Sequence, residues 1–245
     1  MNSKSILMGA GTALAVILVV LGAFLNAIHA EAVRIELYDT DSRAAVARMH
    51  GGDPVRDAAA VEAYIGMNAE EQHRFAETVA KYMRGTGETL PEQLNEKEQI
   101  HFADVRNLIQ LARRVSSIFV GVAVLLTIFG CWLSVHPGVY SGRAVALGTA
   151  LGLVLLALFG LWTATHFETA FYRMHELVFP NDLWLMNPET DICIRMMPAE
   201  LFEGAAARCL VGTVWQSALI AVLLLILSKH MRRLIQKWVN APIPG

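Results

Sequence analysis

The sequence predicts an all-α membrane protein with four transmembrane helices in a bundle and a small, mainly helical extracellular cap. The 245-residue chain is 55% hydrophobic with a mean hydropathy of +0.43, which is too apolar for an ordinary soluble fold. Four runs contain no Asp, Glu, Lys or Arg, and each has at least the roughly 20 residues that a helix needs to cross the hydrocarbon core. These runs are residues 5–30, 115–142, 144–165 and 209–228.

Basic residues near the ends of these runs predict their orientation, because Lys and Arg concentrate on the cytoplasmic side of membrane proteins. All 22 acidic residues fall between the first and second runs or between the third and fourth. Arg113 and Arg114 count against this orientation, but the other flanks agree with it. Both termini are therefore expected in the cytoplasm, on the side that carries six basic residues and no acid: Lys4, Arg143, Lys229, Arg232, Arg233 and Lys237.

The apolar runs and the charges between them divide the chain into eight segments. The first run ends in AIHA, but it exceeds the roughly 7 to 15 residues of a signal-peptide core, so we expect a retained helix. The expected segments are transmembrane helix 1 (5–30), an extracellular cap with a lead-in helix (31–114), transmembrane helix 2 (115–135), a cytoplasmic turn (136–143), transmembrane helix 3 (144–165), an extracellular segment (166–208), transmembrane helix 4 (209–228) and a basic cytoplasmic tail (229–245).

Within the two extracellular segments, periodicity predicts mostly helices. Residues 31–39 are the exception, because Val33, Ile35 and Leu37 alternate with charged neighbours and indicate a short strand. Apolar residues at helical spacing predict the remaining elements. These are helices near 42–50, 54–65 and 68–83, a helix that runs from about residue 91 into the second span, and an amphipathic helix at 167–179 followed by turns.

The first candidate group for chemistry lies just before the second span. Glu98, His101 and Asp104 are spaced i, i+3 and i+6, which places both carboxylates beside the imidazole on one helix face. A neighbouring carboxylate favours the imidazolium and orients the ring. Such triples are also common on solvated helix faces, so spacing alone leaves both interpretations open.

The second candidate group follows the third span. His175 stands among apolar residues that favour its neutral, basic form, although a histidine in such a setting is also often a core residue. Asn181, Trp184 and Asp191 follow it, as supporting residues or as simple turn and cap residues. Arg173 and Arg195 are candidate partners for a carboxylate or a lipid phosphate oxygen, or else members of structural ion pairs.

The sequence lacks the motifs that several other classes of protein function need. The chain has no GxSxG elbow, no Gly-rich phosphate loop and no His/Cys cluster at metal-ligand spacing, so we expect no metal, no cofactor and no nucleic-acid partner. No Lys or Arg lies inside a span, which counts against an ion path. Three cysteines cannot form a disulfide framework, and whether Cys193 and Cys209 pair is left open.

Two stretches resemble a known family. EQIHFADV (98–105) is similar to an E-x-x-H-x-x-D-V motif, and FYRMHELVFPNDLWLMNPETDICIRMMPAELF (171–202) to an F-x-x-x-H-x-x-x-F-x-N-x-x-W-x-x-x-P-x-x-D-x-x-I-x-x-x-P-x-x-x-F block. Both belong to the lipoprotein intramolecular transacylases (Lit-type) of Gram-positive bacteria. Phe102, Asn187 and Cys193 depart from the commoner pattern without removing a group that the reaction clearly needs.

The resemblance implies a multi-pass enzyme of the bacterial cell membrane with its active site outside. It would move the sn-2 acyl chain of a diacylglyceryl-modified lipoprotein onto the amine of its own N-terminal cysteine, giving an N-acyl lyso-lipoprotein. The family's two essential histidines correspond to His101 and His175. Two other interpretations stay open: a non-catalytic protein whose cap binds a partner or senses pH, and an acyltransferase with an external phospholipid donor and Cys193 as nucleophile.

Overall fold

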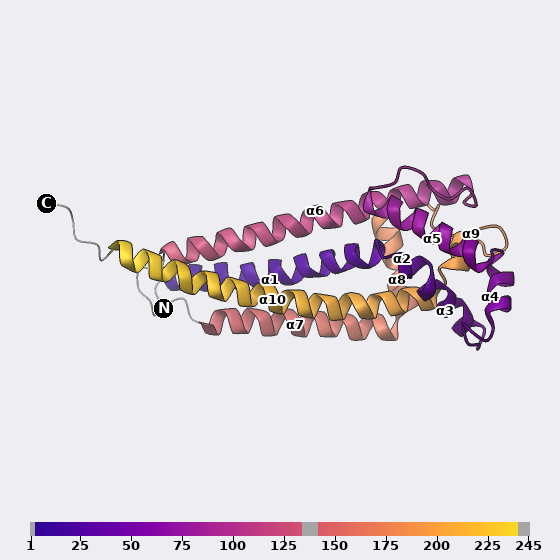
Figure 1. The fold of residues 1–245 in the computed structure, drawn as a ribbon. Coiled ribbons are helices and arrows are strands. Elements are labelled where there is room, and N and C mark those ends of the chain that lie inside the picture. The colour runs from indigo at the N-terminus through magenta and orange to yellow at the C-terminus, as the bar shows by residue number, and fades with distance from the viewer. Residues whose placement is uncertain (1–2, 134–141, 240–245) are drawn as a thin grey trace. The chain divides into compact units, whose positions relative to one another are not determined.

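The computed structural model describes residues 3–133 and 142–239, and these are helical with no strand (Figure 1). The predicted cytoplasmic turn at 136–143 falls almost entirely outside the described residues. The helices are α1 Ser3–Ala32, α2 Ile35–Tyr38, α3 Thr40–Met49, α4 Ala58–Ile65, α5 Ala69–Arg84, α6 Glu96–Leu133, α7 Gly142–Thr165, α8 Phe167–Val178, α9 Ile192–Met196 and α10 Ala199–Val239.

Three helices are long and apolar enough to cross a membrane: Ala13–Ala32 of α1, Glu96–Phe129 of α6 and Ala199–Met231 of α10. A fourth candidate is the pair formed by Leu151–Thr165 of α7 and Phe167–Val178 of α8, which are bent by 107° relative to each other. The predicted fold class, an all-α multi-pass membrane protein, is confirmed. The lead-in helix also continues into the second apolar run without interruption, as α6.

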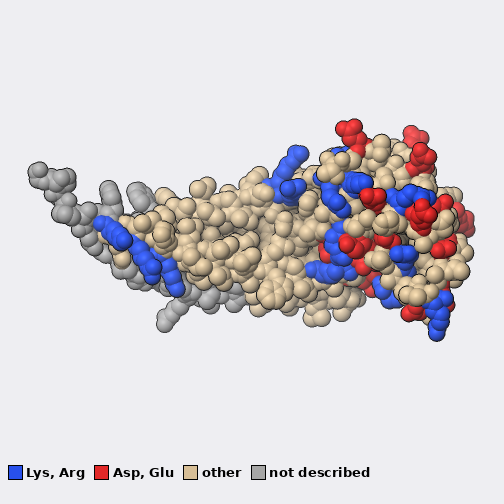
Figure 2. Space-filling view, in the orientation of Figure 1, with Lys and Arg blue, Asp and Glu red and all other residues tan. Residues whose placement is uncertain are grey.

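The chain forms two compact units. The first, called here the apolar unit, comprises Met1–Asn26, Arg114–Phe159 and Leu210–Gly245, and the second, the polar unit, comprises Ala27–Arg113 and Gly160–Cys209. Acidic and basic side chains gather over the elements of the polar unit, whereas most of the visible surface of the apolar unit is uncharged up to the basic end of α10 (Figure 2).

Small residues and a few polar side chains bring the helices of the apolar unit together. Ala15, Val19 and Ala123 form a buried cluster between α1 and α6. The hydroxyl of Ser116 donates to the carbonyl oxygen of Gly22 at 2.8 Å, and a Cβ at Gly22 would lie only 3.3 Å from the Ser116 carbonyl oxygen. Close contact through small residues is the usual way in which transmembrane helices associate.

The polar unit has a larger hydrophobic core, to which α2, α3, α4, α5, α9 and the adjoining parts of α6 and α10 contribute. Its best-defined element is α5, because Asn68 and Glu71 form a reciprocal capping box at its start and Gly85, at φ +80°, ends it in the left-handed region. The helix buries Phe75 and Val79 in the core.

The predicted strand at 31–39 is wrong. α1 continues to Ala32, and residues 35–38 form the helix α2, in which the adjacent Leu37 and Tyr38 are both buried. The hydroxyl of Tyr38 donates to the carbonyl oxygen of Ala32 at 2.6 Å and closes the connection. An alternating pattern predicts a strand only where another strand can pair with it, and the described part of the chain contains none.

Candidate active site

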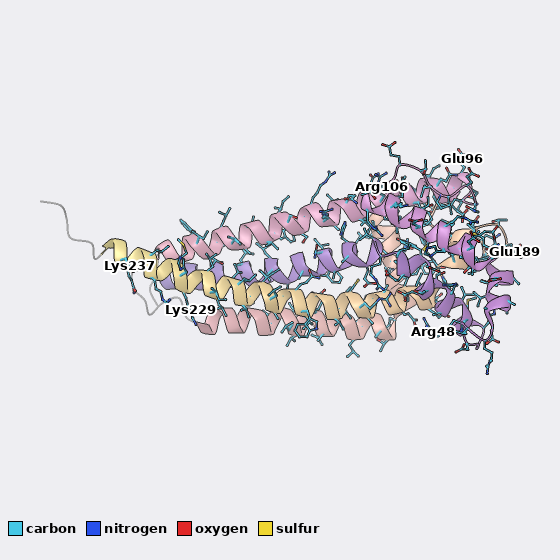
Figure 3. All side chains as sticks on the ribbon, viewed as in Figure 1. Arg48, Glu96, Arg106, Glu189, Lys229 and Lys237 are labelled. Atoms are coloured by element: carbon cyan, nitrogen blue, oxygen red, sulfur yellow. The ribbon has the colours of Figure 1, made fainter. Side chains whose placement is uncertain are left out.

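Both candidate histidines lie in the polar unit, on two different helices. His101 is in the first part of α6, and the labels of Glu96 and Arg106 bracket this part in Figure 3. The segment of α6 before Val115 carries seven charged residues, in contrast to the uncharged remainder of the helix. His175 is in the last turn of α8. The two imidazole rings lie 6.2 Å apart between centroids, so the structure brings the two residues together.

The immediate surroundings of His175 are aromatic. Its ring centroid lies 4.1 Å from that of Phe171, 5.1 Å from that of Trp184 and 5.4 Å from that of Phe179. Its Nδ1 lies 2.7 Å from the carbonyl oxygen of Phe171. A carbonyl oxygen can only accept, so Nδ1 carries the proton and Nε2 keeps its lone pair.

Burial lowers the pKa of His175, and the hydrogen bond to the carbonyl of Phe171 only partly opposes this effect. The side chain is therefore neutral at pH 7, as its apolar sequence neighbours predicted. Together with the proton on Nδ1, this leaves Nε2 able to accept a proton from a bound group.

His101 is buried too, and its ring lies edge-on to Phe179 at 5.1 Å. Its pKa is lowered to about 4, mainly by burial and also by the nearby His175 and Lys97, while the charge of Asp104 opposes this shift. The spacing argument favoured an imidazolium, and that expectation is wrong because the loss of hydration outweighs the charge of Asp104. Nδ1 of His101 is buried and has no hydrogen-bond partner within the described chain.

Glu98 does not orient His101, although their spacing predicted it. One carboxylate oxygen of Glu98 accepts from the backbone N–H of Asn95 at 2.8 Å, while the side chain of Asn95 accepts from the N–H of Glu98 at 2.9 Å. This is a capping box at the start of α6. The other oxygen accepts from the backbone N–H of Cys193 at 2.6 Å, so Glu98 joins α6 to α9.

Asp191 is a second buried carboxylate that holds the segment between α8 and α9. It accepts hydrogen bonds from Asn187, Asn95, Thr190 and Lys97, at 2.8, 2.9, 3.0 and 3.3 Å. Burial alone would raise its pKa, but these donors outweigh burial and lower it. Asp191 therefore ties the loop that carries Trp184 to the start of the helix that carries His101.

Asp104 and Asn181 make a third link between the two histidine-bearing regions. The side-chain amide of Asn181 donates to Asp104 at 3.1 Å, and its carbonyl oxygen accepts from the backbone N–H of Leu183 at 3.1 Å. Asn181 therefore shapes the turn after α8 and fastens it to α6.

Sequence reasoning missed two residues of this assembly, Asn95 and Lys97. Lys97 donates to the carbonyl oxygen of Leu185 as well as to Asp191. The N-x-x-E spacing of Asn95 and Glu98 ahead of a long helix is a capping signal that could have identified Asn95. No local signal identifies Lys97, because its partners Leu185 and Asp191 lie 88 and 94 residues further along the chain.

The two arginines lie outside this assembly. Arg173 is exposed and pairs with Glu176 at 2.9 Å. Arg195, on α9, has a buried Nε without a hydrogen-bond partner and forms no ion pair with a described carboxylate. The structure brings neither arginine into contact with the two histidines, so their predicted role in binding stays a prediction.

Cys193 does not have the properties of a nucleophile. Its thiol is buried, and burial together with the negative charges of Glu98 and Asp191 raises its pKa, whereas a reactive cysteine needs an accessible thiolate. Cys193 and Cys209 form no disulfide with each other, so the pairing left open by the sequence does not occur. In the described ranges no three His, Cys, Asp or Glu side chains are arranged to hold a metal ion.

Fold and site together define a class of protein: a multi-pass helical membrane protein with two buried, neutral imidazoles suited to proton transfer and with no activated cysteine beside them. Residues 12–202 match the family described as lipoprotein intramolecular transacylase Lit, and the chain belongs to this family. The chain is therefore a membrane enzyme, a transacylase that acts on lipoproteins.

Solved structures of the same family share the fold. The chain is similar to the membrane-integral lipoprotein intramolecular transacylase Lit of Bacillus cereus, with a TM-score of 0.67 and 21% identity over 95% of this chain and 100% of that one. Two variants of the Bacillus protein, with one histidine replaced by arginine or by alanine, give a TM-score of 0.65 and 22% identity over 94% of this chain. No curated protein sequence matches the chain.

Proposed function

We propose that this enzyme transfers the sn-2 acyl chain of a diacylglyceryl-modified lipoprotein to the α-amino group of the cysteine that carries the lipid. The product is an N-acyl lyso-lipoprotein with unchanged total acyl content. One observation carries the proposal: in a member of the transacylase family, two buried and neutral imidazoles lie 6.2 Å apart. Imidazoles suit both proton transfers that ester aminolysis needs near neutral pH.

The proposed reaction moves two protons and no external group. The amine attacks the ester carbonyl carbon while Nε2 of His175 accepts a proton from the attacking nitrogen. His101 donates an N–H to the developing oxyanion or to the departing alkoxide. A C–N bond forms, the C–O bond to the glycerol breaks, and the proton lost by the amine replaces the one given to the alkoxide.

No protein nucleophile is needed for this reaction, because amine and ester belong to one substrate molecule and proximity is already supplied. The buried thiol of Cys193 and its raised pKa support this route over one with an external donor and a covalent acyl-cysteine. The tautomer imposed on His175 by the carbonyl of Phe171 supports its assignment as the base.

The remaining candidates act as positioning or binding residues in this proposal. Glu98 and Asp191 hold the segment 184–193 against the start of α6, and Asn181 fastens the turn after α8 to Asp104. The ring of Trp184 lies 5.1 Å from that of His175, tilted by 35°. Arg173 and Arg195 are candidate contacts for the lipoprotein, and the unpartnered Nε of Arg195 is the supporting observation.

The proposed topology places both termini in the cytoplasm and the histidines outside, in the cell membrane of a bacterium. The supporting observation is the distribution of charge, with six basic and no acidic residues on the cytoplasmic flanks. Reporter fusions after residues 88 and 240 test it: a periplasmic-type phosphatase should be active at the first position only, and the reverse pattern would refute the topology.

Mass spectrometry of lipoproteins tests the reaction itself. The enzyme is expressed in a host that makes only diacyl lipoproteins, with His101→Ala and His175→Ala as variants and an empty vector as control. A lyso product of unchanged acyl content supports internal transfer. Added acyl mass would support an external donor, and no change would support a role in binding.

A further inference from the structure

The helix α8 has an unusual position in the chain. It follows α7 after a single residue, His166, and the two helices are bent by 107°. The ring of His166 stacks on Trp162 in the last turns of α7 at 6.4 Å. With 12 residues, α8 is too short to cross a bilayer alone. The chain therefore turns sharply at the end of an apolar helix and continues as a short one.

Three different faces run along α8. The buried face carries His175, and a polar exposed face carries Thr169, Arg173 and Glu176. A third face is apolar and uncovered, because Met174 and Leu177 are 42% and 87% exposed. These two residues follow Ala170 at i+4 and i+7, so they share one side of the helix.

A second exposed apolar surface lies at the end of α7, next to α8 in the chain. In the last turns of α7, Leu161 and Trp162 are 64% and 45% exposed, and Trp is typical of the membrane interface. Met174 and Leu177 are exposed apolar residues on the helix that follows this surface in the chain. Short helices with one apolar and one charged face lie in the plane of the interface, with the apolar face among the acyl chains.

We infer that α8 is an interfacial helix, with Met174 and Leu177 inserted among the lipid acyl chains and Thr169 and Glu176 in water. Because His175 lies next to Met174 on the same short helix, this placement holds its imidazole close to the level at which glycerol esters lie. The last step rests on the proposed function, whereas the placement of the helix does not.

Spin labels test the placement without reference to activity. Met174→Cys and Leu177→Cys are compared with Thr169→Cys and Glu176→Cys in a Cys131→Ser background, in which the remaining Cys193 and Cys209 are buried. The labelled proteins are placed in vesicles of phosphatidylethanolamine and phosphatidylglycerol. Collisions with O2, which partitions into lipid, and with a water-soluble nickel chelate are then measured.

The expected result is a higher ratio of O2 to nickel collisions at 174 and 177 than at 169 and 176. Equal ratios at all four positions would overturn the inference. Protection of 174 and 177 from both reagents, with dipolar broadening between labels, would show a second copy of the chain there and would also overturn it. Protection that appears only when lipoprotein is added would assign the face to the substrate instead.

Measurements of enzyme activity provide a second test of the placement of α8. Leu177→Glu should lower the rate of lyso-lipoprotein formation in vesicles by about tenfold, and Leu177→Ile should retain it. The thermal unfolding midpoint of Leu177→Glu should stay unchanged, because the side chain has few packing contacts to lose. If the mass spectrometry contradicts the proposed reaction, the collision ratios still test the placement of α8. If the reaction occurs but the collision ratios are equal, α8 is not an interfacial helix.

Discussion

Replacing Glu98 with alanine tests whether this buried carboxylate joins α6 to α9. Glu98 is 1% exposed, and its two oxygens accept from the backbone N–H groups of Asn95 and Cys193. The substitution leaves the buried N–H of Cys193 without an acceptor, which costs about 1 to 3 kcal/mol, whereas water can reach the N–H of the exposed Asn95. The region that includes the Cys193 amide should therefore open more easily by about 1 to 3 kcal/mol.

Hydrogen exchange of the Cys193 amide measures this opening directly. Because 1.4 kcal/mol corresponds to a factor of ten, the lower limit of about 1 kcal/mol predicts an exchange rate about fivefold faster in Glu98→Ala than in the native enzyme. Glu98→Gln keeps one acceptor oxygen and should lie between the two.

Glu96→Ala is the matched control, because Glu96 is an exposed carboxylate two residues before Glu98 and its removal should change stability by less than about 0.5 kcal/mol. If Glu98→Ala accelerates exchange at Cys193 no more than Glu96→Ala does, the link between the two helices contributes nothing and the reasoning fails.

Three other predictions concern the imidazoles and the thiol. His101→Ala and His175→Ala should each lower lyso-lipoprotein formation by about 10²- to 10⁴-fold while membrane insertion persists, which mass spectrometry and membrane fractionation measure; full activity in either would refute its assignment. The pKa of His101 is lowered to about 4, so as the pH falls from 6.5 toward 4 the unfolded chain binds a proton that the native chain does not, and the thermal midpoint should fall. His101→Phe should lose much of this pH dependence. Identical pH profiles in the native enzyme and in His101→Phe would contradict the prediction. Cys193→Ser should retain transfer, and native Cys193 should resist alkylation at pH 8, because its thiol is buried with a raised pKa; loss of transfer with intact folding would restore the covalent route.

Local patterns predicted the helices well, because apolar length and helical periodicity depend on neighbouring residues. The long α6 and the amphipathic α8 lie where periodicity indicated them, whereas the short α9 was not predicted. Helix starts were less accurate: α4 begins at Ala58 rather than near 54, because the carboxylate of Asp53 accepts from the backbone N–H groups of Val55 and Arg56 and forms a turn there.

The candidate site was predicted in part. The sequence indicated both histidines and most residues around them, and the aromatic neighbours of His175 correctly predicted its neutral form. It misjudged the state of His101, since a nearby Asp104 is visible in the sequence whereas burial is not. It also could not find Lys97, whose partner Asp191 is 94 residues away.

By itself, the sequence determined that this chain is helical, enters a membrane and carries two histidines in polar segments next to apolar ones. Only the tertiary structure decided that the histidines meet, that Glu98 binds the backbone of Cys193 rather than orienting His101, and that the thiol of Cys193 is buried. The physical reason is the sequence separation of the residues that interact. Helix formation and membrane insertion depend on consecutive residues, whereas loss of hydration and the choice of hydrogen-bond partner depend on residues that only folding brings together.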